Sequence, residues 1–137
     1  MIFPMTVSSF FPAAGWFILV LVLICLPGDS MPDTSAWGLF LESVYFDKWV
    51  HAALFGILHF LMLYPVLKNP SSTAGNTRVL TGVTLFCVLW GFVTESIQLY
   101  IPGRDFDFAD GVADTAGIIL SLLVCLTWKK RNRSKKG

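Results

Sequence analysis

Hydrophobic residues gather in four long stretches separated by short polar segments, at about residues 10–26, 49–67, 79–100 and 109–128. Each stretch approaches or reaches the roughly 20 residues that a helix needs to cross a hydrocarbon core. Because backbone groups in lipid must be hydrogen-bonded within their own segment, all four are predicted to be helices. The pattern therefore predicts an all-α polytopic membrane protein, a single-domain bundle of about four transmembrane helices.

The composition agrees with this pattern and excludes an ordinary soluble domain. The chain of 137 residues is 55% hydrophobic and 14% charged, with a mean hydropathy of +0.67. A soluble domain averages about 25% charged residues, and a small one has too much surface for so much apolar sequence. Its three cysteines lie in apolar runs without a disulfide or zinc spacing, so they are predicted to be packing residues.

The first stretch is predicted to be a retained helix rather than a cleaved signal peptide. It has no positively charged segment before it, and no small-x-small cleavage site precedes Pro27. Pro12 lies near its start and shortens the part that is firmly helical.

The charges are divided between the two ends of the predicted bundle. Eight of the ten basic residues lie between the second and third stretches or in the tail, residues 129–137, whereas the acids lie near the other helix ends. Cytoplasmic segments carry the excess of lysine and arginine, so both termini are predicted to be cytoplasmic and the acidic end to face outward. The basic tail is expected to anchor on anionic lipid rather than to bind nucleic acid. The nine acids are Asp29, Asp33, Glu42, Asp47, Glu95, Asp105, Asp107, Asp110 and Asp114.

Ionisable residues at the start of the second helix are the first functional candidates. An Asp or Lys at the centre of a transmembrane helix costs about 2.5–3.5 kcal/mol, so such residues usually have a role. Asp47 and His51 are four residues apart and could pair on one helix face, with Lys48 beside them. The alternative is that Lys48 only anchors the helix at the headgroups. Deeper in the span, His59 is expected to be a neutral histidine hydrogen-bonded to a neighbouring helix.

Glu95 and Gln98 lie near the outer end of the third helix. With that helix ending near Tyr100, Glu95 would lie roughly 7–8 Å inside it at 1.5 Å per residue. A carboxylate at that depth must be paired, protonated or face a polar cavity. The spacing of three places Gln98 on nearly the same face.

The fourth helix begins with further acids. Asp107 and Asp110 are placed to cap this helix and complement its dipole, but Asp114 lies a further turn inside. Asp110 and Asp114 would share one face, which requires a cation or a shared proton. Arg104 is the obvious compensating cation, and Lys48 is a second candidate.

A stripe of small residues, Ala113, Gly117 and Ser121, also lies along the fourth helix. It is predicted to let another helix approach closely. The topology brings the start of the second helix, the end of the third and the start of the fourth to one membrane face. The candidate binding cluster at that face comprises Asp47, Lys48, His51, Glu95, Gln98, Arg104, Asp107, Asp110 and Asp114.

These spaced residues resemble the VanZ-like family of small bacterial membrane proteins. The resemblance covers about residues 44–125 and lies in Asp47-Lys48-x-x-His51, Glu95-x-x-Gln98, and Pro102-Gly103-Arg104 followed by Asp110 and Gly117. One departure is Asp114, where the family often has Asn. The resemblance implies a bacterial envelope role in the cytoplasmic (inner) membrane. The family's namesake is associated with teicoplanin, a glycopeptide antibiotic, but the family has no settled reaction.

Three functions compete at this point. The cluster could bind a polar or anionic lipid or a lipid-linked cell-wall component, with Arg104 and Lys48 holding phosphate. It could instead be an enzyme site, with Glu95 or Asp110 as general base and His51 as its partner. It could also be a self-satisfied polar cluster that locks the bundle. Acids and a histidine could bind a divalent cation, but no spacing such as His-Glu-x-x-His predicts a metal, and no cofactor is predicted. The oligomeric state stays open.

Overall fold

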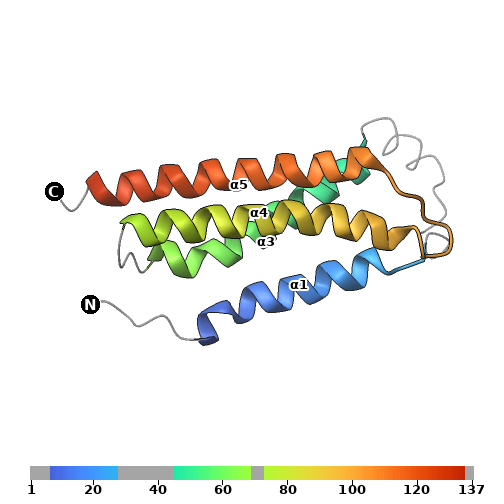
Figure 1. The fold of residues 1–137 in the computed structure, drawn as a ribbon, viewed down its shortest axis with the longest axis horizontal. Helices are drawn as coiled ribbons and strands as arrows, with labels where there is room; N and C mark the ends of the chain where they lie inside the picture. Colours follow the sequence, from blue (N-terminus) through green and yellow to red (C-terminus); the bar gives the residue numbers. More distant parts are fainter. Residues whose placement is uncertain (1–6, 28–44, 69–72, 135–137) are drawn as a thin grey trace.

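The computed structural model describes residues 7–27, 45–68 and 73–134. A 3-10 turn, Val7–Phe10, leads into the first of four α-helices, which are α1 (Phe11–Ile24), α3 (Phe46–Lys68), α4 (Thr73–Gln98) and α5 (Phe108–Ser134). The helices run side by side along an elongated bundle (Figure 1). The described ranges contain no strand, so the all-α prediction is confirmed. The acids Asp29, Asp33 and Glu42 and the last three residues of the basic tail lie outside the described residues.

Within the described ranges, three helices are long and apolar enough to cross a membrane, namely α3, α4 and α5. The fourth, α1, has 14 residues and carries a proline in its first turn, as the position of Pro12 led us to expect. The observed helices are longer than the apolar stretches at several ends. In particular, α3 begins at Phe46 rather than at residue 49, and α5 continues through the basic tail to Ser134. Asp47 and Lys48 therefore lie on α3 itself.

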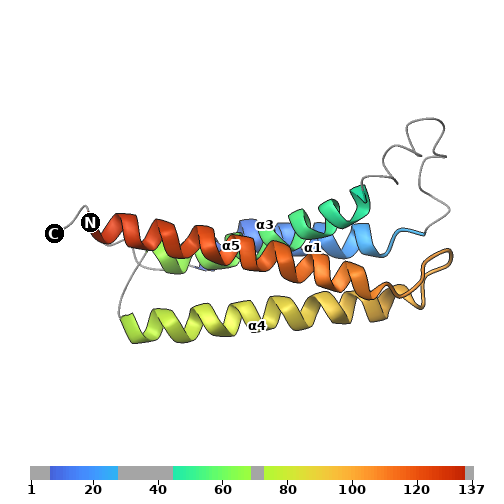
Figure 2. The ribbon, with the colours of Figure 1, turned by 90° about the horizontal axis from the view of Figure 1, so that it is seen from above.

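The closest helix pair is α3 and α5, and glycine makes this approach possible. Viewed from above, α4 lies along one side of the bundle while α5 runs close to α3 (Figure 2). A Cβ atom on Gly117 would lie 1.9 Å from the carbonyl oxygen of Ala52, and one on Gly56 would lie 2.9 Å from that of Gly117. The backbones thus touch where no side chain intervenes, which is how small residues stabilise helix pairs in membranes. The packing role predicted for this part of the small-residue stripe is confirmed.

Away from this contact, the core is built from side chains of all four helices. Val20 and Ile24 of α1 pack with Phe55, Cys87 and Ile118. Two of the three cysteines, Cys87 and Cys125, are buried, while Cys25 at the end of α1 is exposed. The packing role predicted for the cysteines therefore applies to two of them.

His59 connects three helices in the interior of the bundle. It is fully buried, and its Nδ1 and Nε2 atoms each lie 2.9 Å from a hydroxyl, of Ser121 and Thr84 respectively. The Thr84 hydroxyl gives its one hydrogen to the carbonyl of Leu80, at 2.8 Å. It must therefore accept from Nε2–H, which leaves Nδ1 to accept from Ser121. This is the neutral, hydrogen-bonded histidine that the sequence led us to expect.

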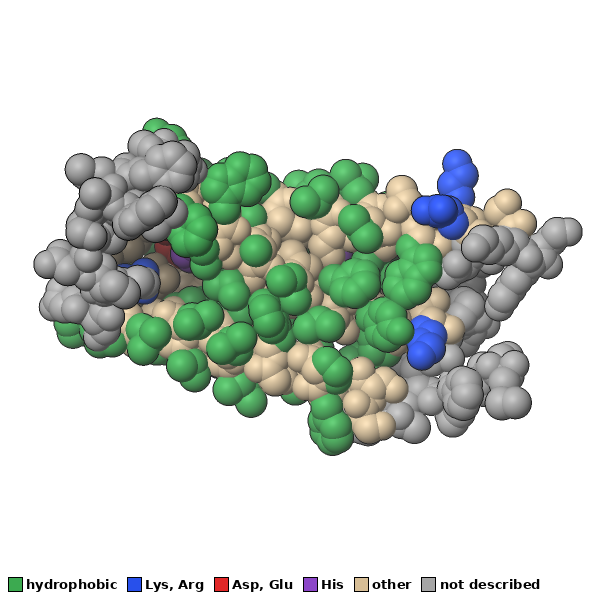
Figure 3. Space-filling model, turned by 180° about the vertical axis from the view of Figure 1, so that it is seen from behind, with side chains coloured by type: hydrophobic (Ala, Val, Ile, Leu, Met, Phe, Trp, Pro, Cys, Tyr) green, Lys and Arg blue, Asp and Glu red, His purple; other side chains and the backbone are tan. Residues whose placement is uncertain are grey.

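The outer surface of the bundle is apolar along its length, as a bilayer requires. Leu89 and Leu120 each leave 65% of their surface exposed, and many other large hydrophobic side chains also point outward. Figure 3 shows hydrophobic side chains spread over the middle of the molecule, with acidic atoms visible near one end of this face. In water such a surface would drive aggregation. The chain is an integral membrane protein.

The glycine contact yields a direct test of the packing. Gly117→Ala is expected to destabilise the protein by about 3 kcal/mol, because the new methyl group would force α3 and α5 apart. Gly82→Ala is the matched control, since a Cβ atom there meets nothing within 4 Å. It should be neutral or slightly stabilising, because alanine favours a helix. Thermal unfolding in detergent micelles compares the two, and equal melting temperatures would contradict the proposed contact.

Candidate functional site

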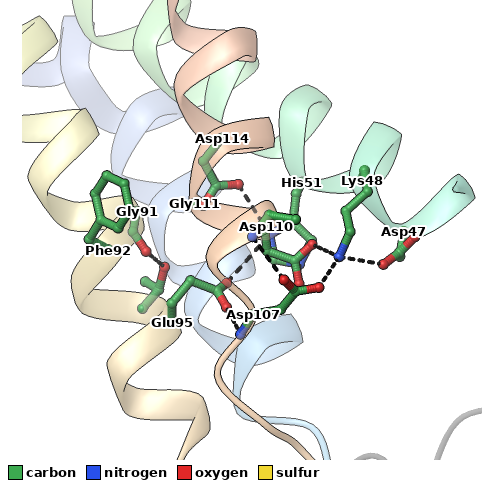
Figure 4. Close-up of polar contacts among 12 residues, drawn as sticks. Asp47, Lys48, His51, Gly91, Phe92, Glu95, Asp107, Asp110, Gly111 and Asp114 are labelled. Atoms are coloured by element: carbon green, nitrogen blue, oxygen red, sulfur yellow. Dashed lines mark hydrogen bonds and ion pairs between the residues drawn. The ribbon is translucent and has the colours of Figure 1, made fainter.

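The predicted cluster forms where four segments meet at one end of the bundle (Figure 4). The first turns of α3 carry Asp47, Lys48 and His51, and the last turns of α4 carry Glu95 and Gln98. The segment between α4 and α5 carries Arg104 and Asp107, and the first turns of α5 carry Asp110 and Asp114. Eight of these nine residues gather there around Lys48, His51 and the end of α4, and Arg104 lies apart from them.

Lys48 is the cation that compensates the acids of α5. Its ammonium group bonds to Asp107, lies 2.6 Å from Oδ1 of Asp110, and is 3.0 Å from Oδ2 of Asp47. The prediction that Arg104 would have this role is wrong. Arg104 instead donates from Nε to the carbonyl of Leu26 at 3.4 Å, after α1. The turn before α5 carries Arg104 away from the helix face on which Asp110 lies, whereas Lys48 reaches across from α3.

His51 lies among three carboxylates from the neighbouring helices. Its Nδ1 atom is 3.1 Å from Oδ1 of Asp114 and 3.8 Å from Oε1 of Glu95, and its Nε2 atom is 3.7 Å from Oδ2 of Asp110. The predicted pairing of His51 with Asp47 along one helix face is replaced by these contacts between helices. Asp47 turns instead to Lys48 (Figure 4).

Glu95 and Asp114 are both buried. Neither acid can be explained as a helix cap or as an anchor at the membrane surface. Their side chains are 0% and 1% exposed. Glu95 accepts from the backbone N–H of Asp107 through Oε2, at 3.4 Å. Among the described residues, however, neither Oε1 of Glu95 nor Oδ2 of Asp114 has a hydrogen-bond partner. A buried carboxylate oxygen without a partner is costly, so these two atoms mark the place where the cluster is incomplete.

Gly91 makes room for Asp114 and is a site residue that the sequence analysis missed. A Cβ atom on Gly91 would lie 3.1 Å from Oδ2 of Asp114, so any larger residue would press on this carboxylate. Gly91, Glu95 and Gln98 follow one another at intervals of four and three residues, which places them on one face of α4. That spacing is a signal in the sequence that could have identified Gly91. Gln98 is 2% exposed on the same face.

Asp107 joins the cluster to the start of α5. Its Oδ1 atom accepts from the backbone N–H of Ala109 at 2.8 Å, so Asp107 is the N-cap residue, as predicted. The hydrogen bond from Lys48, together with the one from Ala109, holds the pKa of Asp107 below its ordinary value. This residue therefore fixes the start of α5 both to its own first turn and to α3.

The charges in the cluster do not balance. Among the described residues, five carboxyl groups, including two that are almost completely buried, face one lysine and one histidine. Within the described part of the chain, one donor atom each from His51, Glu95 and Asp114 lies within 4.8 Å of the other two, which is close enough for a shared metal ion. The arrangement favours a positively charged or hydrogen-bond-donating group over a bare anion.

Apolar membrane-crossing helices and a buried cluster of ionisable residues at one end define a small multi-pass membrane protein with a polar site. The chain matches the VanZ/LLP1 family over residues 15–129, and it belongs to that family. This confirms the VanZ-like resemblance that the spaced polar residues indicated. No curated protein and no solved structure matches the chain.

The link between Lys48 and Asp107 predicts an acid-dependent stability. The pKa of Asp107 is lower in the folded state than in the unfolded state, where it is about 3.9. The ion pair therefore stabilises the protein fully above the unfolded pKa. This stabilisation is lost as the pH falls through the pKa of the folded state. Asp107→Asn keeps an N-cap oxygen but removes this charge. The melting temperature should therefore be lower than that of the wild type at pH 7, and the difference should shrink below about pH 4.

Thermal unfolding in detergent between pH 3 and pH 7 measures this difference. Asp105→Asn, a change at an exposed acid two residues earlier, is the control and should leave the profile unchanged. A constant difference between the wild type and Asp107→Asn across this range would show that the ion pair contributes nothing.

Proposed function

We propose that this protein binds a membrane lipid or a lipid-linked envelope component, with the polar headgroup at the cluster and an acyl chain along a groove between α3 and α5. The groove has a volume of about 400 Å³ and is lined by Trp49, Ala52, Ala53, Gly56, Ile57, Phe60, Gly117, Leu120, Ser121 and Val124. This volume lies in the range of roughly 300–1,000 Å³ that is typical of small-molecule sites.

The observation that carries the proposal is that the groove begins on the same turns of α3 that carry the cluster. Trp49 and Ala52, at the start of the groove, are the neighbours of Lys48 and His51 in the chain. An amphiphile lying along this seam would place its polar group beside the cluster and its hydrocarbon beside Gly56 and Gly117. Since the groove lies on the apolar outer surface, the occupant that suits it is the acyl chain of a lipid from the surrounding bilayer.

The charge of the cluster limits the kinds of lipid headgroup that suit it. Lys48 is already bonded to three carboxylates, and Arg104 contacts the carbonyl of Leu26 rather than the cluster, so the cluster itself is not arranged around a cation that could hold a phosphate. The excess of acids favours a headgroup that presents an ammonium group or hydroxyls. We therefore place a zwitterionic or sugar-bearing lipid ahead of a purely anionic one.

A photoreactive lipid tests this proposal. Nanodiscs that contain phosphatidylethanolamine with a diazirine in its acyl chain should label peptides that line the groove. Ala53→Phe, which fills the groove, should reduce this labelling at least fivefold. Ala116→Phe is the matched control, because Ala116 is exposed on α5 but does not line the groove. Phosphatidylglycerol with the same acyl chain should label less. Equal labelling of all three proteins would contradict the proposal.

An enzyme acting on an envelope lipid is the second candidate. It is favoured by the position of His51, whose ring nitrogens lie within 3.8 Å of three carboxylates, an arrangement suited to proton transfer. Turnover of a lipid by the purified protein, lost in His51→Gln, would support this candidate. A purely structural cluster is less well supported, because two of its buried carboxylate oxygens have no hydrogen-bond partner among the described residues.

We also propose that the protein lies in the bacterial cytoplasmic membrane with both termini inside. The end of the bundle opposite the cluster carries Lys68, Arg78 and the basic residues at the end of α5, as the rule for cytoplasmic segments requires. The polar cluster would then face outward.

The exposed Cys25 provides a natural probe of this orientation, because the other two cysteines are buried. A membrane-impermeant maleimide should label the wild type in intact spheroplasts and should not label Cys25→Ser. Lys68→Cys in the Cys25→Ser background should be labelled only after permeabilisation. The opposite result for the two positions would reverse the proposed orientation.

A further inference from the structure

The buried part of the cluster contains a donor set drawn from three different helices. His51 comes from α3, Glu95 from α4 and Asp114 from α5, and one donor atom of each lies within 4.8 Å of the other two. Zinc bonds to nitrogen and carboxylate oxygen at about 2.0–2.2 Å, which places neighbouring ligands of a tetrahedral ion roughly 3.4 Å apart. The observed separations of 3.1 Å and 3.8 Å from Nδ1 of His51 to the two carboxylates lie on either side of this value.

An independent observation points to a missing partner at this place. Glu95 is completely buried, and its Oε1 atom, which faces Nδ1 of His51, has no hydrogen-bond partner among the described residues. Asp114 is almost completely buried, and its Oδ2 atom also has no hydrogen-bond partner among the described residues. A cation between the carboxylates and the imidazole would satisfy groups that the helices alone leave unpaired.

Charge leads to the same conclusion. Lys48 is bonded to Asp47, Asp107 and Asp110, and no contact joins it to Glu95 or Asp114 among the described residues. As metal ligands, the two carboxyl groups would be ionised and the imidazole neutral, so the three ligands would carry two negative charges. A divalent cation balances both charges with one ion.

We infer that His51, Glu95 and Asp114 bind a divalent first-row transition metal ion. One imidazole and two carboxylates form a mixed nitrogen and oxygen set, which suits Zn²⁺ or Mn²⁺ better than Ca²⁺ or Mg²⁺, whose ligands are oxygens. Three protein ligands leave at least one coordination position open, as in catalytic rather than structural zinc sites. The metal site draws on the same acids as the proposed headgroup, but its test requires no lipid in the groove.

Metal titration of the full-length protein tests the inference. Purified protein in detergent, freed of metal with a chelator, should bind Zn²⁺ or Mn²⁺ at one ion per chain in isothermal titration calorimetry. Glu95→Gln and Asp114→Asn keep the shape of the side chains and remove their charge, and each should weaken binding at least tenfold. Asp105→Asn, a change at an exposed acid at the same end of the bundle but outside the cluster, is the matched control, and it should bind as tightly as the wild type.

A spectroscopic measurement on the wild type keeps the test decisive if a variant does not fold. With Cu²⁺ as the probe, pulsed electron paramagnetic resonance should detect a coordinated imidazole nitrogen, and Zn²⁺ should displace the signal. The chain has only one other histidine, His59, whose two ring nitrogens are bonded to hydroxyls. The inference would be overturned by absence of the imidazole signal, by a lack of saturable binding, or by equal weakening in Asp105→Asn.

Discussion

The ionic contacts of Lys48 hold together the end of the bundle on which the site depends. One ammonium group on α3 meets Asp110 on α5, Asp107 just before α5, and Asp47 on its own helix. In a bilayer such charges are tolerated only when they are paired or lie close to water. The need to pair them therefore fixes the start of α5 against the start of α3, and it places the remaining acids around His51.

A second constraint is the contact of α3 and α5 through glycine, which keeps the two helices close together farther into the bundle. The backbones touch at Ala52, which follows His51, and at Gly117, which lies about one turn beyond Asp114. Farther along, His59 connects the same pair to α4 through Ser121 and Thr84. Polar pairing, close backbone packing and a buried hydrogen-bond network thus follow one another along the seam. The groove lies on the outer side of this seam, so its shape depends on all three.

The excess of acid at the end of the seam links this architecture to function. A structural cluster would be expected to satisfy its own buried groups, since each unpaired one costs free energy. Here, within the part of the chain that the structure describes, Glu95 and Asp114 retain oxygens without a hydrogen-bond partner beside a histidine, while Lys48 is bonded to other carboxylates. An incomplete arrangement of this kind is typical of a binding site, in which a ligand or an ion supplies the missing partner. Both the proposed headgroup and the inferred metal ion are positively charged or hydrogen-bond-donating for this reason.

The sequence by itself determined the helical class, the polar end and most of the residues in the cluster. Long apolar stretches leave the backbone no alternative to helices in lipid, and Glu95 and Asp114 stand out because each lies where an unpaired charge is costly. Only the tertiary structure decided which groups pair. Arg104 is nearer in sequence to Asp110 than Lys48 is, yet Lys48 makes the contact because α3 crosses α5 there. Sequence spacing reports neighbours along one helix, whereas the pairing of charges depends on how different helices approach.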